Sequence, residues 1–176
     1  GLVGSEMCIR DRRFEVKSST GRLETASFRS PIFRMSLEEM RAKRIVRFWI
    51  KAEVPAGGAV RVVIWVRSRS AAEKGLAFHE GGASFQLAEL RFSTGWKLLE
   101  LDYFSALSRW NGLEEENEWY IEWYVDSSSR TPTKVWVDCF EIAGAVVGGR
   151  EAELEPLVLP SASMAVEGAV VRVAVY

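Results

Sequence analysis

Hydrophobic and polar residues alternate along several short stretches of this chain. Apolar residues occupy every second position in 45–54, in 59–66 and again in 118–126. Successive side chains of a β-strand point to opposite faces of a sheet, so this alternation predicts three strands that each bury one face. A Pro-Ala-Gly-Gly sequence at 55–58 separates the first two stretches. It is typical of a tight turn, which predicts that these two strands pair as a hairpin.

Shorter runs of extended character fill much of the remaining chain. They lie at 14–17, 25–35, 83–92, 96–103 and 135–142. A mixed segment at 68–82 is predicted to be a long loop, and Ser36 followed by Glu39 is a helix-start signal for one or two turns. About eight to ten short strands with so little helix are typical of a β-sandwich. The predicted fold class is therefore all-β, with antiparallel sheets.

The composition changes along the chain and suggests four parts. Residues 1–12 show no periodicity and resemble translated adapter sequence, so we expect a non-native leader, with an ordinary linker as the alternative. Residues 13–145 hold the predicted strands and form one domain, a size that suits the 176-residue length. Residues 146–160, rich in Gly, Val, Glu and Pro, are expected to be a linker. Residues 161–176 are expected to be an added strand or the start of a truncated second domain.

Charge and hydropathy narrow the range of partners. The formal net charge is −1, which gives no overall electrostatic attraction to nucleic acid or to an anionic membrane. No apolar run approaches the roughly 18 residues of a transmembrane helix. The chain has seven tryptophans, and such large rings are expected either in a core or against a ligand. Trp96, Trp119 and Trp123 are predicted to lie in the core.

Several aromatic and charged side chains are predicted to point outward from the strands. Flat rings with a few directed polar groups are suited to binding sugars, because the rings stack on sugar faces while the polar groups meet hydroxyls. Neighbouring cations would favour an acidic polysaccharide. The alternatives are rings packed against loops or another domain, and a solvated charged face. The candidate ligand-binding residues are Trp49, Trp65, Arg47, Arg67, Tyr120, Tyr124 and Glu122.

A single acid, Asp138, interrupts the apolar stretch at 135–142. Desolvating an unpaired carboxylate costs several kcal/mol. Asp138 is therefore predicted to have a partner, either a metal ion or backbone N–H groups.

Three segments in this order resemble the galactose-binding-like, jelly-roll carbohydrate-binding modules. They are Ile-Val-Arg-Phe-Trp-Ile-Lys-Ala at 45–52, Thr-Gly-Trp-Lys at 94–97, and Trp-Val-Asp-Cys-Phe at 136–140. The resemblance covers residues 13–145 and implies an antiparallel jelly-roll β-sandwich. It also implies non-catalytic binding of a polysaccharide, an extracellular or cell-surface location, and a neighbouring catalytic domain in a larger secreted protein.

The same resemblance implies a structural calcium ion. In this family an acid of the closing strand helps to hold the ion together with a Glu near the N-terminus, positions matched here by Asp138 and Glu15. Hard oxygen ligands of this kind suit calcium. The sequence departs from the family pattern at Cys139, where a second acid is common.

Catalysis has little support in the sequence. The one histidine, His79, lies beside Glu80 in a Gly-rich segment, with no recognisable nucleophile motif, phosphate-binding loop or zinc cluster. We therefore predict a non-catalytic binding domain. Two rivals stay open: a structural β-sandwich that mediates protein contacts in a surface, capsid or fibre protein, and a small lyase or hydrolase with paired titratable groups.

Overall fold

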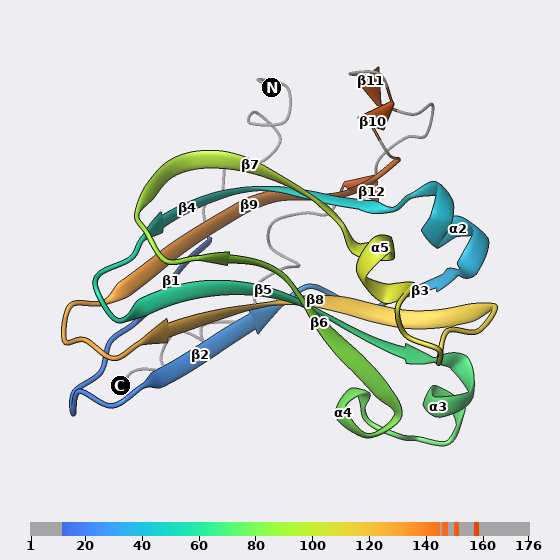
Figure 1. Ribbon diagram of the computed structural model, residues 1–176, viewed down its shortest axis with the longest axis horizontal. Coiled ribbons are helices and arrows are strands. Elements are labelled where there is room, and N and C mark those ends of the chain that lie inside the picture. The colour runs from blue at the N-terminus through green and yellow to red at the C-terminus, as the bar shows by residue number, and fades with distance from the viewer. Residues whose placement is uncertain (1–11, 145, 148–149, 152–156, 159–176) are drawn as a thin grey trace.

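The protein is a sandwich of two antiparallel β-sheets, seen edge-on as two layers in the computed structural model (Figure 1). The structure describes residues 12–144, 146–147, 150–151 and 157–158. The upper layer in this view is called sheet A and the lower layer sheet B. Sheet A contains, in order across it, β1 (Arg12–Val16), β9 (Thr133–Ala143), β4 (Ile45–Glu53) and β7 (Thr94–Asp102). Sheet B contains β2 (Glu24–Arg29), β8 (Glu116–Ser127), β5 (Gly58–Ser68) and β6 (Gly82–Leu90).

Short strands extend these layers. β3 (Phe33–Ser36) continues the line of β2 along β8 after a break at Pro31. β12 (Leu157–Val158) pairs with β9 and so adds part of the predicted linker to sheet A. β10 (Val146–Val147) and β11 (Arg150–Glu151) pair with each other. The predicted leader, apart from Arg12, and the predicted final segment 161–176 lie outside the described residues.

The strand order identifies the fold as a jelly roll. With β3 counted as the continuation of β2, the orders β1-β9-β4-β7 and β2-β8-β5-β6 place consecutive strands in alternate sheets, except for β5 and β6, which pair with each other in sheet B. Eight strands crossing between two sheets in this way form the double Greek key of a jelly roll. The predicted all-β, antiparallel jelly-roll β-sandwich is confirmed.

The predicted β4–β5 hairpin is wrong. β4 pairs with β7 and β9 in sheet A, whereas β5 pairs with β6 and β8 in sheet B. The turn at 55–58 forms as expected, with Gly57 at φ 85° and the Gly58 N–H donating to the Pro55 carbonyl at 2.9 Å. It carries the chain from one sheet to the other. Alternation correctly predicted which residues of each strand face inward, but it does not specify the neighbouring strand.

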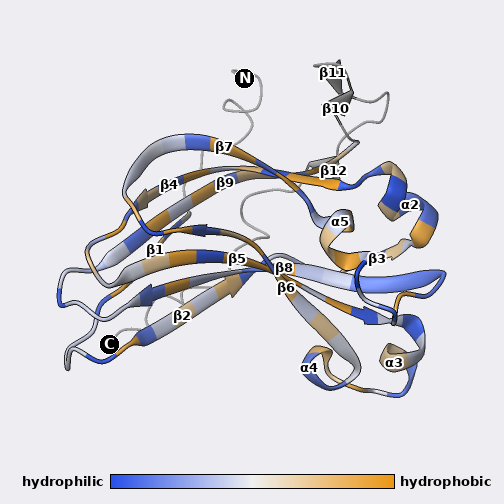
Figure 2. Ribbon diagram, in the orientation of Figure 1, coloured by the Kyte–Doolittle hydropathy of each residue, from blue (hydrophilic) through white to orange (hydrophobic). Residues whose placement is uncertain are grey.

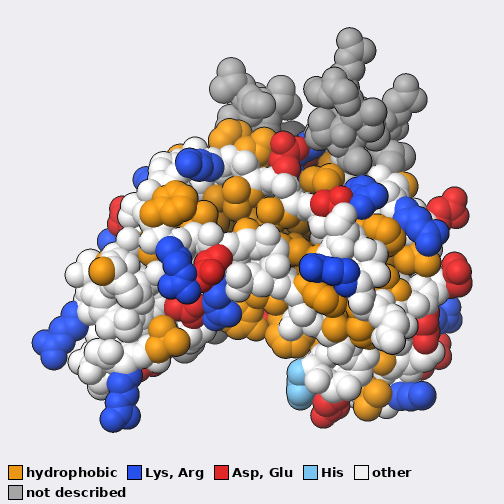
Figure 3. Space-filling view, viewed as in Figure 1, with side chains coloured by type: hydrophobic (Ala, Val, Ile, Leu, Met, Phe, Trp, Pro, Cys, Tyr) orange, Lys and Arg blue, Asp and Glu red, His pale blue; other side chains and the backbone are white. Residues whose placement is uncertain are grey.

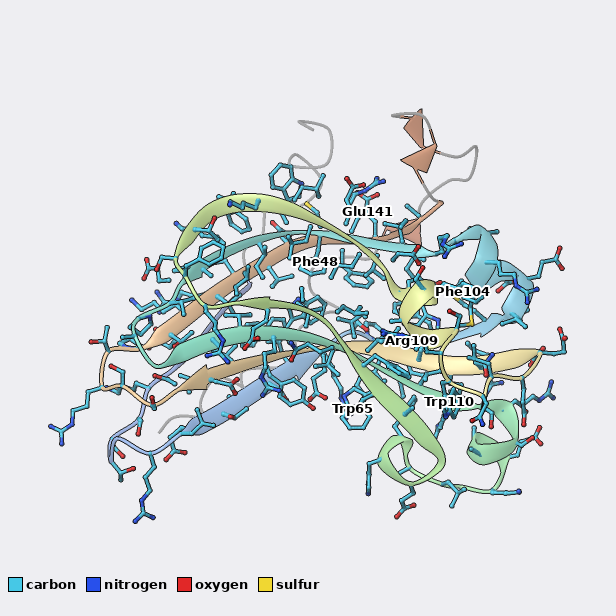
Figure 4. The ribbon with its side chains drawn as sticks, in the orientation of Figure 1. Phe48, Trp65, Phe104, Arg109, Trp110 and Glu141 are labelled. Carbon is cyan, nitrogen blue, oxygen red and sulfur yellow. The ribbon has the colours of Figure 1, made fainter. Side chains whose placement is uncertain are left out.

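The core is a set of aromatic rings between the sheets, and Figure 4 shows Phe48 among them. Trp123 stacks on Phe28 at 5.0 Å between ring centroids and meets Phe48 and Phe140 edge-on at 5.3 and 5.8 Å. Figure 2 shows apolar positions recurring along the strands of both layers. These four rings are among the largest fully buried side chains, and their packing joins the two sheets.

Two of the three predicted core tryptophans are confirmed. Trp119 and Trp123 are fully buried, whereas Trp96 is 40% exposed, so its prediction is wrong. Trp96 lies on the outer side of β7, which is the edge strand of sheet A. β7 has a neighbouring strand on one side only, so the surrounding sheet covers Trp96 less than it would cover a residue of a central strand.

β9 keeps one buried face by means of a β-bulge. Its pairing with β4 slips by one residue next to Asp138, and Cys139 adopts φ 57° there. One extra residue in a strand shifts the alternation of side chains between the faces. As a result Val135 and Val137 before the bulge, and Phe140 and Ile142 after it, all have no exposed surface.

The short helices lie at one end of the sandwich, on the right in Figure 1. The predicted helix after Ser36 is confirmed as α2 (Leu37–Ala42), with a capping box between Ser36 and Glu39. The segment predicted as a loop at 68–82 contains α3 (Arg69–Glu73) and α4 (Phe78–Gly81) instead. Helices this short span barely one turn, so no period is visible in the sequence. The last is α5 (Tyr103–Leu107), which begins at an Asp102 cap. Within the described residues, no helix has the length and apolar character needed to cross a membrane.

Candidate binding face on sheet B

The structure divides the candidate ligand-binding residues between the two outer faces of the sandwich. Trp49 and Arg47 lie on β4 in sheet A, and the other five lie on β5 and β8 in sheet B. Figure 4 shows Trp65 on the side of sheet B away from sheet A, with Glu141 beyond sheet A on the opposite side of the molecule. Because β4 and β5 belong to different sheets, Trp49 and Trp65 cannot form one platform. The larger group, on sheet B, is brought together.

Strand pairing aligns the aromatic residues of this face. Trp65 on β5 lies directly opposite Tyr120 on β8. Their rings are nearly parallel, at 17° and 6.4 Å between centroids. Phe78 from α4 meets the Tyr120 ring edge-on at 4.8 Å. Three rings from three elements therefore form one aromatic cluster on the outside of sheet B.

A pocket opens over this cluster. Its volume is about 410 Å³, and α4 forms one of its walls. Figure 3 shows the outline of the molecule hollowed below sheet B, on the side where α4 projects. Trp65 is half-buried and Tyr120 is buried at the pocket floor, whereas Arg29 and His79 are exposed at its margin. The lining residues are Arg29, Ile32, Trp65, Arg67, Ala77, Phe78, His79 and Tyr120.

Arg67 and Glu118 fix the pocket wall to the sheet. The Arg67 guanidinium donates to Glu118 Oε2 at 2.8 Å and to the Leu76 carbonyl at 2.6 Å, and it lies 4.4 Å from the Phe78 ring centroid. Arg34 donates to the other oxygen of Glu118 at 2.8 Å. Burial opposes ionisation of Glu118, but the hydrogen bonds from Arg34 and Arg67 outweigh it and lower the pKa of the carboxyl.

We expect Glu118→Gln to weaken the fold by about 1–3 kcal/mol at pH 7, the range for charge-assisted hydrogen bonds. A carboxyl whose pKa is lower in the folded state stabilises the fold above its unfolded pKa. That contribution is lost as the pH falls through the folded pKa. Urea unfolding of both proteins at several pH values measures it, and the difference should shrink below about pH 4. A difference that is equal at pH 7 and pH 3 would contradict the proposed ionised state of Glu118.

The half of the face beyond the pocket is a connected polar network. Arg61 makes two hydrogen bonds to Asp126, at 2.6 and 3.1 Å, and its guanidinium lies 4.8 Å from the Tyr124 ring centroid. Thr25 donates to the same carboxylate at 2.7 Å. The hydrogen bond with Asp126 raises the pKa of Arg61. These hydrogen bonds hold the Arg61 side chain in one position, and its charge is balanced by Asp126.

Tyr124 and Glu122 continue the network toward the pocket. The Tyr124 hydroxyl donates to Glu122 Oε1 at 2.7 Å, and the Ser27 hydroxyl donates to Oε2 at 2.6 Å. Burial, followed by the bond to Glu122, raises the pKa of Tyr124, so its phenol stays protonated at neutral pH. The Trp65 indole opposes this rise in the pKa of Tyr124, although its buried N–H makes no hydrogen bond.

The candidates on sheet A have a different environment. Arg47 is 9% exposed and forms ion pairs with Glu100 at 3.0 Å and Glu141 at 3.5 Å. Trp49 is half-buried and lies opposite Leu98 on one side and Asp138 on the other. Arg47 is therefore already engaged by carboxylates of its own sheet.

Asp138 and Glu15 are not brought together. Glu15 pairs with Lys134, four residues before Asp138 on β9, which is roughly 13 Å along a strand. Asp138 Oδ1 accepts a hydrogen bond from the Cys139 backbone N–H at 2.9 Å, the alternative that the sequence left open. Among the described residues, no group of three or more His, Cys, Asp or Glu side chains is placed to hold a metal ion. Calcium binding stays a prediction.

Sequence reasoning missed part of the pocket. Arg29 had a usable signal, because Thr25, Ser27 and Arg29 alternate with apolar residues and so face outward with β8. Phe78 and His79 had none, since they lie in a helix that the pattern of 68–82 did not predict. His79 is 72% exposed at its side chain, and its nearest described acid is Glu80 at 3.9 Å.

The fold and this face define a jelly-roll β-sandwich with an aromatic pocket on one outer face. No protein-family model matches the chain, and no curated protein matches it. The function of the chain must therefore be inferred from the residues and geometry of this face.

Proposed function

We propose that this chain is a non-catalytic carbohydrate-binding domain that uses the outer face of sheet B. The observation that carries the proposal is the pocket over Trp65 and Tyr120, with its nearly parallel rings. In this proposal the domain belongs to a larger secreted protein and attaches it to a polysaccharide outside the cell. The partner is a glycan, without nucleic acid or membrane insertion.

The composition of the pocket supports sugar binding. Aromatic rings supply flat apolar surface for the C–H face of a sugar ring, and a few polar groups at the margin can meet its hydroxyls. Arg29 and His79 are such groups, and both are exposed. A volume of about 410 Å³ lies within the usual range for small-ligand sites.

The site is also held in its shape before any ligand arrives. Arg67 fastens the loop before α4 to β5 and β8 through Leu76 and Glu118. Arg61 and Asp126 fix the far end of the face in the same manner. A site that needs little ordering on binding loses less affinity to entropy.

Trp65→Ala should abolish most of the binding. A tryptophan at the centre of an interface contributes about 2 kcal/mol or more, which corresponds to at least about a 30-fold loss of affinity. Affinity electrophoresis through gels that contain acidic or neutral polysaccharides measures the loss. Trp49→Ala is the matched control, because Trp49 is equally half-buried but lies on the opposite sheet. Repeating the electrophoresis with and without a chelator tests whether retention depends on calcium.

The outcomes separate the proposed function from its main rival. Retention that falls in Trp65→Ala and persists in Trp49→Ala supports a glycan site on sheet B. Equal loss in both variants would contradict that location. If the folded wild-type protein passes all polymers unretarded and forms oligomers, a structural sandwich that mediates protein contacts becomes the better account.

A further inference from the structure

Arg29 differs from the other arginines on the outer face of sheet B. Arg34, Arg61 and Arg67 each pair with a carboxylate, at N–O distances of 2.8, 2.6 and 2.8 Å. Arg29 makes no ion pair with a described carboxylate. Its guanidinium instead lies 5.2 Å from the centroid of the Tyr120 ring and lines the pocket.

The carboxylate nearest to Arg29 in the strand pairing is engaged by other residues. Glu122 is the residue directly opposite Arg29 in the pairing of β2 with β8. Its two oxygens accept hydrogen bonds from Tyr124 and Ser27, at 2.7 and 2.6 Å. The Glu122 carboxylate therefore accepts hydrogen bonds from two neutral hydroxyls, although the Arg29 residue lies opposite it on β2. Arg29 is therefore not paired with Glu122. Its guanidinium lies at the pocket margin beside Tyr120, where it partly offsets the rise that burial causes in the pKa of the Tyr120 hydroxyl.

We propose that the pocket binds an anionic sugar unit, with its carboxylate or sulfate held by Arg29 and its ring against Trp65. This inference rests on the proposed carbohydrate-binding function and specifies its substrate class. A guanidinium presents donors in a planar fork that matches both anions, and the π face of Tyr120 keeps the fork in position. Arg67, behind Phe78, is satisfied by Glu118 and Leu76, so it does not compete for the ligand.

The sequence alone pointed to different cations for the same role. From the sequence, the cations expected to favour an acidic polysaccharide were those around the two outward tryptophans, Trp49 and Trp65. The structure shows Arg47 and Arg67 engaged by Glu100 and Glu118. Arg29, which comes from a third strand, is the arginine of the pocket left for an external anion.

The test compares polymers that differ only in charge. Binding of the full chain is measured by affinity electrophoresis on polygalacturonate and its carboxyl-reduced form, and on a sulfated galactan and its desulfated form. The two pairs distinguish a carboxylate from a sulfate. The variants are Arg29→Gln and Arg22→Gln, since Arg22 is also exposed and its replacement removes the same charge from the turn before β2. Thermal unfolding verifies that both variants are folded.

We expect stronger binding to the charged member of at least one pair. Arg29→Gln should weaken that binding about tenfold or more, as expected for a lost charge-assisted contact, and should weaken binding to the neutral member by a clearly smaller factor, because only hydroxyl contacts are lost there. Arg22→Gln should stay within about twofold of the wild type, because its charge is largely screened from the pocket.

Three results would overturn the inference. Equal binding to both members of each pair, with Trp65→Ala still defective, rejects the anionic ligand but keeps the carbohydrate site. Equal weakening by Arg29→Gln and Arg22→Gln shows diffuse charge attraction rather than a pocket contact. Absence of binding to all four polymers by the wild type removes the proposed function and this inference together.

Discussion

Trp123→Ala is expected to cost about 3–5 kcal/mol of unfolding free energy, the usual range for removing a buried Trp or Phe. Trp123 is fully buried and touches rings from both sheets: Phe28 in sheet B, and Phe48 and Phe140 in sheet A. Its removal leaves a cavity in the middle of the sandwich that rigid strands cannot close. Domains of this size have unfolding free energies of only about 5–15 kcal/mol. The substitution would therefore remove a large fraction of the stability of the fold.

Trp123→Phe is the matched control. It keeps an aromatic ring between the sheets and removes an indole N–H that is buried without a hydrogen-bond partner. Its cost should therefore be less than half that of alanine. Urea unfolding followed by circular dichroism gives both values. A loss below about 1 kcal/mol in Trp123→Ala would mean that this ring does not join the sheets.

Gly82→Ala should destabilise the protein by about 3 kcal/mol or more, at the upper end for overpacking. A Cβ at this position would fall well inside van der Waals distance of the Val66 carbonyl oxygen and 2.9 Å from that of Phe78. Both are backbone atoms, so no side-chain rotation relieves the clash. Gly82 lies opposite Arg67, where α4 leads into β6. Relief requires α4 to move off β5, which would take Phe78 out of the pocket wall.

Gly95→Ala provides the comparison, because a Cβ there would meet no atom within 4 Å. It should leave the unfolding free energy within about 0.5 kcal/mol of the wild type. We also expect Gly82→Ala to lose polysaccharide retention at temperatures where it is still folded. Equal stability of the two variants would show that α4 does not pack closely on β5.

The sequence predicted the inward faces of the sandwich well, for a physical reason. Burying one face of a strand forces alternation, and Val46, Phe48 and Ile50 follow that rule without exception. Which strands are neighbours in a sheet could not be predicted in this way, because a hairpin turn and a turn between sheets use the same Pro and Gly residues. That ambiguity placed Trp49 next to Trp65, although they lie on opposite outer faces.

The site was predictable in the same uneven way. Trp65, Tyr120, Glu122 and Tyr124 belong to long alternating strands, and the structure does bring them onto one face. The pocket itself needs α4, whose four residues carry no periodic signal. Arg29 was visible as an outward position, but its importance comes from Glu122 being held by Tyr124 and Ser27, which only the side-chain geometry reveals.

β1 and β9 are adjacent and antiparallel in sheet A. Arg12 at the start of β1 lies beside Val137 near the middle of β9, which continues to Ala143. The first strand of the sandwich and its last long strand therefore lie side by side in sheet A, the layer opposite the pocket. In the larger protein of the proposed function, a host attached through these strands would approach the domain from the side of sheet A. The host and a long polymer bound across sheet B would then lie on opposite sides, and neither would obstruct the other.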